Sequence, residues 1–165
     1  EQLPFADGTF DAALAQLVVH FMADPVVGLR EMSRVTRPGG PVAACVWDHA
    51  GGGSPLSTFW SAVHDVDPSG RDESGLAGAR EGHLAELCEQ AGLQQVESSR
   101  LTVDVGFESF ERWWEPYTQG VGPAGVYLAQ LDEPRRQQLQ ARCAELLPPG
   151  PFTVAAAAWC VRARS

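Results

Sequence analysis

Two nearly continuous apolar runs flank an amphipathic segment near the start of the chain. Residues Phe10–Val19 (FDAALAQLVV) and Pro41–Trp47 (PVAACVW) are apolar at most positions. A run that is apolar on both faces is typical of a parallel strand covered by helices. Between them, Asp24 followed by Pro25 predicts a helix start, because Asp caps free N–H groups and Pro fits the first helical position. The pattern therefore predicts a right-handed strand–helix–strand unit of a parallel sheet.

The rest of the chain mixes helix and strand signals. The spacing of apolar residues predicts helices over Leu56–Val63 and Gly82–Gly92, and alternation predicts a strand over Gln95–Gly106. Phe107–Leu147 predicts an aromatic-rich helical stretch. The last segment, Phe152–Ala163, is ambiguous, because its four consecutive alanines favour a helix whereas its Val and Trp residues favour a strand.

Composition and charge narrow the class of protein. A chain of 165 residues, 44% hydrophobic and 20% charged, suits one compact domain with its own core. The net charge is −9, and the 12 basic residues are all scattered arginines, which disfavours a nucleic-acid partner. No apolar run approaches the roughly 20 residues of a membrane-spanning helix, and no signal peptide opens the chain. We expect a cytoplasmic protein that acts on a small molecule and has no membrane partner.

The cysteines and histidines show no metal-binding pattern. The widely spaced cysteines form no Cys-x-x-Cys and no Cys/His pair at zinc spacing. Cys45 and Cys160 lie in apolar runs, which is typical of a small buried side chain. We therefore expect reduced thiols and no metal site. The four cysteines are Cys45, Cys88, Cys143 and Cys160.

One ordered set of motifs resembles a known family. The strings LPFADGTFD (Leu3–Asp11), LREMSRV (Leu29–Val35) and RPGG (Arg37–Gly40) occur in this order and spacing. Up to Asp48, the chain resembles class I S-adenosylmethionine-dependent methyltransferases of the ubiquinone/menaquinone-biosynthesis type. The resemblance implies an α/β fold: a partial Rossmann-like sheet holding strands four to seven, with the last strand antiparallel. We expect a single truncated domain over 1–165.

The resemblance also implies a cofactor, S-adenosylmethionine, and its contacts. The family's glycine-rich loop and ribose-binding acid lie upstream of the motifs found here, so we expect methyl transfer to be incomplete in this chain alone. By resemblance, Ala15, Gln16 and Leu17 line the methionine and adenosine portions of the cofactor. His20, in the same exit loop, is a candidate to touch the cofactor or to act as a base for a hydroxyl or amine substrate.

Aromatic residues are the candidates for substrate binding. Trp47 and Asp48 end a strand and point to the edge where ligands bind in open α/β sheets. By resemblance, 107–147 is a substrate-facing helical insertion before the last strand. Its rings, with one upstream tryptophan, are candidates to wall an apolar pocket or cage a cation. Core packing is the alternative, expected for at least two of the four. They are Trp60, Trp113, Trp114 and Tyr117.

A second glycine motif does not fit its usual context. The stretch Gly120–Gly125 matches G-x-G-x-x-G, which binds phosphates only where it leaves a strand and opens a helix. No apolar strand precedes it, and Pro123 lacks a backbone N–H donor. The sequence therefore predicts a loop here. This weakens a nucleotide-dependent oxidoreductase as a third functional alternative.

The resulting hypothesis is methyl transfer from S-adenosylmethionine to an unidentified small molecule. The alternative is a non-catalytic small-molecule-binding or interaction module, whose ligand binding S-adenosylmethionine would not affect. An apolar strand over 10–19 at a sheet edge promotes pairing with another chain. We therefore expect a homodimer or swapped assembly through that strand, or a separate N-terminal half.

Overall fold

The computed structural model describes residues 1–165, which divide into two compact units. Strands β3 and β4 contribute residues to both units, and each unit has its own core. Unit 1 is formed by Glu1–Gly53, Ser74–Thr102 and Ala157–Ser165. Unit 2 is formed by Ser54–Glu73 and Val103–Ala156.

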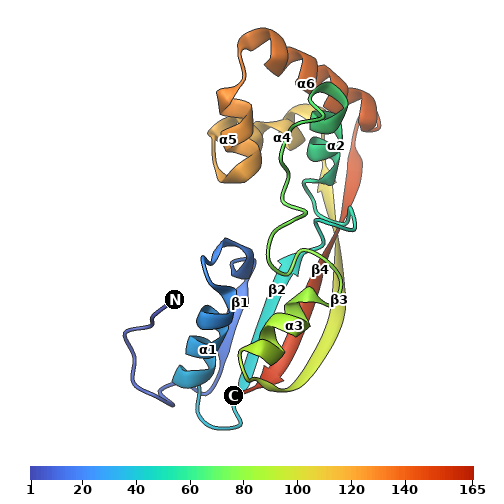
Figure 1. Cartoon of the computed structure of the whole chain (residues 1–165). Coiled ribbons are helices and arrows are strands. Elements are labelled where there is room, and N and C mark those ends of the chain that lie inside the picture. The colour runs from blue at the N-terminus through green and yellow to red at the C-terminus, as the bar shows by residue number, and fades with distance from the viewer. The chain divides into compact units, whose positions relative to one another are not determined.

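A mixed four-stranded sheet carries the α/β fold, in the order β1-β2-β4-β3 (Figure 1). The predicted parallel pair is confirmed, because β1 (Ala13–Gln16) pairs parallel with β2 (Pro41–Trp47). The last strand, β4 (Phe152–Arg164), pairs antiparallel with β2. Strand β3 (Gln94–Phe107) occupies the far edge of the sheet. The antiparallel last strand expected from the resemblance is therefore present.

Two helices cover one face of the sheet in unit 1 (Figure 1). Helix α1 (Pro25–Val35) begins as predicted, because the Asp24 carboxylate accepts the Val27 N–H at 3.0 Å. Helix α3 is His83–Gln90. Both helices bury aliphatic side chains against the strands and form one apolar core. Its large aliphatic members are Val19, Leu29, Met32, Val42, Val46, Leu84, Leu87, Leu93 and Val161.

The opposite face of the sheet carries no helix of unit 1. Along β2 burial alternates, so Val42, Ala44 and Val46 point to the helices and the residues between them point away. On the other face Leu14 is 78% exposed and Leu101 is 57% exposed. Although these strands are apolar on both faces, only the face of the sheet that packs against the helices is buried within this chain.

The first predicted strand is shorter than its apolar run. A strand over Phe10–Val19 is wrong, because only Ala13–Gln16 are extended in the sheet, although Phe10 forms an isolated bridge to Thr36. Leu17 takes a left-handed backbone conformation, with φ of 58°, and interrupts the strand. The chain then forms the short 3₁₀ helix η1 (Val19–Phe21). A backbone turn at one residue overrides the hydrophobic pattern here.

The N-terminal loop is fixed to α1 by one arginine. The Arg34 guanidinium donates to the carbonyls of Phe5 and Leu3 at 2.9 and 3.2 Å, and to the Asp7 carboxylate at 2.6 Å. Glu31 accepts from Arg34 and from the Leu3 N–H at 3.0 Å. These bonds, led by the one from Arg34, lower the pKa of Glu31 to about 2. The loop is therefore anchored by polar contacts.

Unit 2 is helical and aromatic. The helices α2 (Ser57–Val66), α4 (Phe110–Trp114), α5 (Gly122–Gln130) and α6 (Glu133–Leu146) surround its core. The 3₁₀ helix η2 (Glu115–Gln119) links α4 to α5. The predicted helical stretch over 107–147 is thus broken into short helices. The rings in the core are Phe59, Trp60, Trp113, Trp114, Tyr117 and Phe152.

Two ambiguous segments take definite structures. The alanine-rich tail forms β4, because its register against β2 runs unbroken from Pro41↔Arg164 to Trp47↔Ala158. Helix propensity favours alanine by well under 1 kcal/mol per residue, so strand pairing and burial outweigh it. In the glycine motif, helix α5 begins at Gly122, so the predicted loop is wrong in its second half. The element before α5 is the 3₁₀ helix η2, so the glycine motif does not follow a strand.

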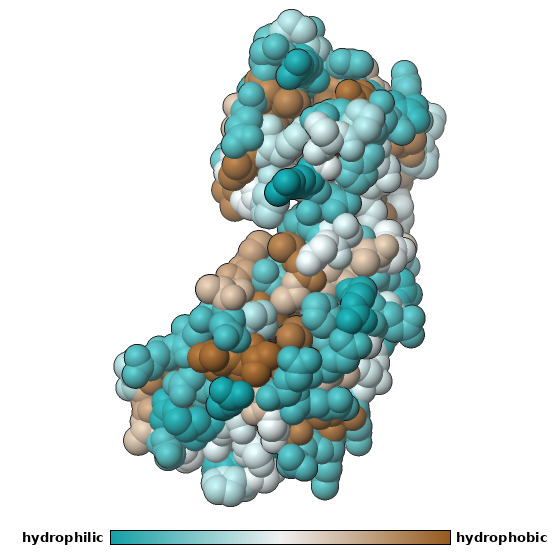
Figure 2. All heavy atoms as spheres, viewed as in Figure 1, coloured by the Kyte–Doolittle hydropathy of each residue, from teal (hydrophilic) through white to brown (hydrophobic).

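The face of the molecule shown in Figure 2 is mainly polar. In the view of Figure 2, hydrophilic residues cover most of the molecule, and apolar residues gather in a few patches. This agrees with the net charge of −9. None of the helices combines the length and the apolar character that crossing a membrane requires.

Candidate functional site

The carboxyl ends of β1 and β2 form one edge of the sheet in unit 1. The two strands are parallel, and their register pairs Gln16 with Cys45. Just beyond this pair, the Leu17 N–H donates to the Cys45 carbonyl at 2.9 Å. Ligands of open α/β sheets bind outside the carboxyl ends of the strands. The residues that follow these two strands are therefore the first place to look for a site.

The three residues predicted to contact a cofactor differ in their surroundings. Ala15 is 6% exposed and belongs to the apolar core, whereas Gln16 is exposed. Leu17 is a bulky residue with φ of 58°, a conformation that costs roughly 1–3 kcal/mol and clusters at ligand sites. The strained turn at Leu17 and the exposed amide of Gln16 therefore make the end of β1 a candidate ligand site, whereas the side chain of Ala15 packs in the core.

His20 is a buried histidine with an unpartnered ring nitrogen. It lies in η1, and its Nδ1 is buried without a hydrogen-bond partner. Its ring centroid lies 4.0 Å from that of Phe21. Burial lowers the pKa of His20, so the ring favours its neutral form. A neutral imidazole with a free nitrogen can accept a hydrogen bond or a proton.

A second histidine lies beside the first. The ring centroids of His20 and His49 are 5.7 Å apart. Sequence reasoning treated His49 as isolated and missed this pairing. The strand register explains the pairing, because Gln16 pairs with Cys45 and each histidine follows its strand residue by the same interval. Parallel pairing then brings both exit loops to the same edge.

Asp48 is held by protein donors after β2. Its carboxylate is buried and accepts from the Gly51 N–H at 2.9 Å and the Trp159 indole N–H at 3.1 Å. Arg100 donates to the other carboxylate oxygen at 3.2 Å. Trp47, the last residue of β2, is half-buried and pairs with Ala158. Asp48 therefore fixes the loop after β2, and its bonds leave the carboxylate in one orientation.

The four predicted substrate-binding aromatics all lie in unit 2. Trp60 donates its indole N–H to the buried Glu73 carboxylate at 3.0 Å, and Trp114 is 6% exposed in the core. Trp113 and Tyr117 also belong to the core, but they line a cavity of about 340 Å³. The cavity is otherwise apolar, formed by Pro55, Leu56, Phe107, Pro116, Val121, Gly122, Pro123 and Ala124.

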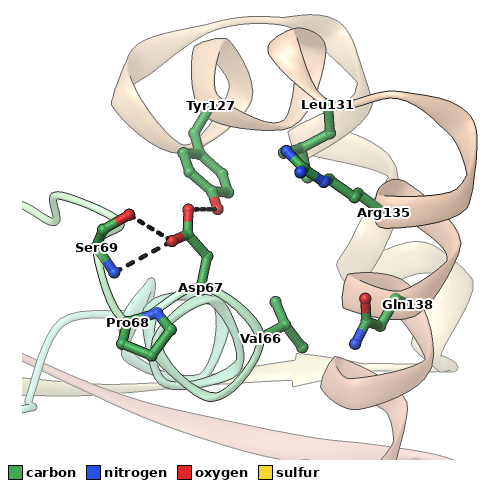
Figure 3. A pocket seen from close by; sticks show the side chains of 8 residues that line it. All are labelled: Val66, Asp67, Pro68, Ser69, Tyr127, Leu131, Arg135 and Gln138. Atoms are coloured by element: carbon green, nitrogen blue, oxygen red, sulfur yellow. Dashed lines mark hydrogen bonds between the residues drawn. The ribbon is translucent and has the colours of Figure 1, made fainter.

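A second cavity in unit 2 is polar and was not predicted (Figure 3). It has a volume of about 360 Å³, and Arg135 and Asp67 are among its lining residues. The Tyr127 hydroxyl donates to Asp67 at 3.0 Å, and the Ser69 hydroxyl donates to the same carboxylate at 2.6 Å. Hydrogen bonds from Ser69 and then Tyr127 lower the pKa of Asp67. No sequence motif joins these distant residues, so only the fold reveals the cavity.

Comparison with known families supports the motif-based resemblance. Residues 1–44 match the methyltransferase domain family. A demethylmenaquinone methyltransferase from Mycolicibacterium vanbaalenii is 52% identical over 63 residues, 38% of this chain and 25% of that protein. A malonyl-[acyl-carrier protein] O-methyltransferase from Erwinia pyrifoliae is 36% identical over 73 residues, 37% of this chain and 28% of that protein. These matches span about a quarter of the curated relatives.

Comparison with solved structures supports the fold. A candidate methyltransferase from Bacillus halodurans superposes with a TM-score of 0.54 at 16% identity, over 99% of this chain and 73% of that one. At that identity the likeness shows the fold alone. The α/β methyltransferase-like fold expected from the motifs is therefore confirmed. The sequence similarity to methyltransferase domains therefore lies in part of the chain, and the likeness of fold extends over nearly all of it.

Proposed function

We propose that this chain serves S-adenosylmethionine-dependent methyl transfer to a small molecule. One observation carries the proposal. Within the segment that matches the methyltransferase domain, β1 is followed by a strained turn at Leu17 and then by His20, whose buried Nδ1 has no hydrogen-bond partner. A bulky residue held at positive φ and a buried nitrogen without a partner both cost free energy. Such costs are expected where a ligand completes the site.

The residues at this edge fit one side of the cofactor. S-adenosylmethionine supplies a methyl group on a sulfonium, which a nucleophile displaces in line. Gln16 offers an exposed amide for hydrogen bonds, and Leu17 offers an apolar side chain beside it. Ala15 contributes through its backbone, because its side chain lies in the core. The glycine-rich loop of the family belongs to sequence upstream of these residues, so they complete a cofactor site without forming all of it.

His20 is proposed to accept a proton from the methyl acceptor. Because burial lowers its pKa, the ring is neutral at physiological pH and its Nδ1 has no competing partner. A neutral imidazole next to the reacting atoms can take the proton that a hydroxyl or amine loses as it is methylated. Trp47 and Asp48 are proposed to shape the same edge, with Asp48 acting through the loop that it holds.

The acceptor is proposed to be a small molecule of partly aromatic or apolar character. The names of two curated relatives point to different acceptors, demethylmenaquinone and malonyl-[acyl-carrier protein], although each relative matches more than a third of this chain. We therefore propose that the segment matching the methyltransferase domain, residues 1–44, serves the cofactor side and that other residues choose the acceptor. The apolar cavity beside Trp113 and Tyr117 is our candidate, with Trp60 and Trp114 supporting its walls.

A further strand is proposed to join the sheet at β1. This strand has β2 on one side and no strand on the other, and its Leu14 is 78% exposed. Unpaired edges with apolar side chains promote pairing. The added strand would come from a glycine-rich half or from a second copy of this chain. A chain that stays monomeric at high concentration in sedimentation equilibrium, alone and with the upstream half, would contradict this proposal.

Calorimetric titration with S-adenosylhomocysteine tests the function. We would compare this chain with a longer form that includes upstream coding sequence. Binding by the longer form alone would indicate that the cofactor site is shared between the two parts. Binding by this chain alone would indicate that an assembly rebuilds the site. Binding by neither form would sink the methyltransferase proposal and favour a binding module.

The role of His20 is tested separately from binding. In a form that transfers methyl groups, His20→Gln is expected to lower kcat by about 100-fold, because a general base contributes roughly that factor or more. His64→Gln is the matched control, since His64 is an exposed histidine in unit 2. Equal rates for the wild type and His20→Gln would exclude His20 as the base.

A further inference from the structure

Two cysteines that are far apart in the sequence lie directly opposite each other in the sheet. Cys45 of β2 pairs with Cys160 of β4 in the antiparallel register. Both side chains are half-buried, and both thiols are free. The sequence alone suggested two separate buried thiols. The other two cysteines, Cys88 and Cys143, are buried and are not opposed in this way.

The position of the pair in the ladder brings the two side chains close. At one end of the ladder the Ser165 N–H donates to the Gly40 carbonyl at 3.0 Å, and at the other end the Asp48 N–H donates to the Ala157 carbonyl at 2.9 Å. Hydrogen-bonded pairs recur at every second residue between these ends. Counting inward, the cysteine pair falls on a non-hydrogen-bonded position. There opposite Cα atoms are about 4.5 Å apart, within the range that a disulfide spans.

The pair is also accessible to small reagents in this chain. It lies on the sheet face without helices, in an open groove of about 390 Å³. Leu14 and Leu101 border the groove with their exposed side chains, and Gln16 lies at its edge. A small disulfide can therefore approach both thiols from one side. Neither Cys88 nor Cys143 lines this groove.

We propose that Cys45 and Cys160 form a reversible cross-strand disulfide, a redox modification site that locks β2 to β4. The oxidant is a small-molecule disulfide. The Cys45 thiolate attacks one of its sulfurs, forms a mixed disulfide and releases one thiolate. Cys160 then gives its proton to solvent and attacks the Cys45 sulfur, releasing the second thiolate. The protein gains one disulfide, and the small disulfide is reduced to two thiols.

The electrostatics of the pair set the order and the pace of these steps. Burial first, and then the neighbouring Cys45 thiol, raise the pKa of Cys160 to about 11. Cys160 therefore stays protonated at neutral pH, and we expect exchange to begin at Cys45. Because only thiolates attack, the second step is expected to accelerate as the pH rises from about 7 to 9.

Mass spectrometry of the full chain treated with oxidised glutathione tests the proposal. We expect a mass lower by two hydrogen atoms, a single cross-linked peptide pair containing Cys45 and Cys160, and reversal by dithiothreitol. Cys88 and Cys143 should remain available for alkylation after unfolding and serve as internal controls. Cys160→Ser should stop at a mixed disulfide on Cys45, with the mass raised by one glutathione.

A second measurement does not depend on oxidation. A trivalent phenylarsenical binds two adjacent thiols at once, so the untreated chain should bind one equivalent and Cys160→Ser should bind none. A mixed disulfide that persists in the unaltered chain, a bridge between two copies, or an absence of arsenical binding would each overturn the proposal.

Discussion

The cores of the two units consist of different kinds of side chain. Unit 1 packs mainly Ala, Val and Leu residues from a mixed sheet against two helices. Unit 2 packs rings against one another, with Phe59 stacked on Tyr117 at 4.6 Å and in edge contact with Trp60 at 5.3 Å. Aliphatic burial depends mainly on area, whereas ring packing depends on mutual orientation. The sequence therefore predicted the periodic core of unit 1, and for unit 2 it predicted that at least two of four aromatic residues pack in a core but not how the rings are oriented.

The comparison extends to chemistry. In unit 1 the functional candidates follow from the order of the strands, because parallel pairing brings the loops after β1 and β2 to one edge. In unit 2 the cavities join residues from distant segments, such as Asp67 and Arg135. The backbone pattern thus indicates the candidate site of unit 1, whereas the cavities of unit 2 depend on side-chain packing.

The largest expected effect is the loss of stability when a buried side chain is removed from the core of either unit. Phe59→Ala should lower the free energy of unfolding by about 4 kcal/mol, and Leu29→Ala in unit 1 by about 3 kcal/mol, because both side chains are fully buried. Urea unfolding followed by tryptophan fluorescence measures both. Val126→Ala, at a half-exposed position, should change the free energy by less than about 0.5 kcal/mol. A loss under about 1 kcal/mol for Phe59→Ala would mean a loosely packed unit 2.

The next effect concerns the hydrogen bonds that the Asp48 carboxylate accepts in unit 1. Asp48→Ala should cost about 2 kcal/mol, because it leaves the Gly51 N–H and the Trp159 indole N–H without their acceptor. Asp104→Ala is the control, since Asp104 is an exposed residue of β3. Thermal unfolding compares the variants. Equal midpoints would show that the Asp48 bonds add no net stability.

Removal of a helix cap should have a smaller effect on stability, of similar size in both units. Asp24 caps α1 and Asp132 caps α6, and each accepts the N–H three residues later at 3.0 Å. Replacing either residue with alanine should cost about 1 kcal/mol of unfolding free energy. Urea unfolding of the two variants serves as a matched pair. No measurable loss for either variant would show that its cap hydrogen bond adds no net stability.

The smallest effect is a difference in response to pH. Burial lowers the pKa of His20 in unit 1 and raises that of Glu73 in unit 2. His20 should therefore reduce stability as the pH falls below about 6.5, where the unfolded chain binds the proton more readily. Glu73 should reduce stability as the pH rises above about 4.5, where the unfolded chain releases its proton first.

Unfolding between pH 4 and 8 separates the two groups. His20→Gln should remove part of the acid-side loss, and Glu73→Gln should remove part of the loss that follows ionisation of the carboxyl. Identical pH profiles for His20→Gln and the wild type would contradict the burial of the His20 ring in solution.

Local signals in the sequence were enough for several elements. The Asp24 cap and the apolar run of β2 act within a few residues, so their effects can be predicted without the fold. The length of β1 could not, because the left-handed turn at Leu17 depends on the carbonyl of Cys45 in another strand. The tail could not be assigned either, because its alanines become a strand only by pairing with β2.

The sequence by itself determined the strand–helix–strand order, the family-like motifs and the edge where a cofactor is proposed to bind. Only the tertiary structure decided which side chains meet there. It placed His20 beside His49, Cys45 opposite Cys160, and Trp113 and Tyr117 at a cavity. The physical reason is range: capping and periodicity act between near neighbours in the chain. Pairing and burial instead depend on residues brought together from distant parts of it.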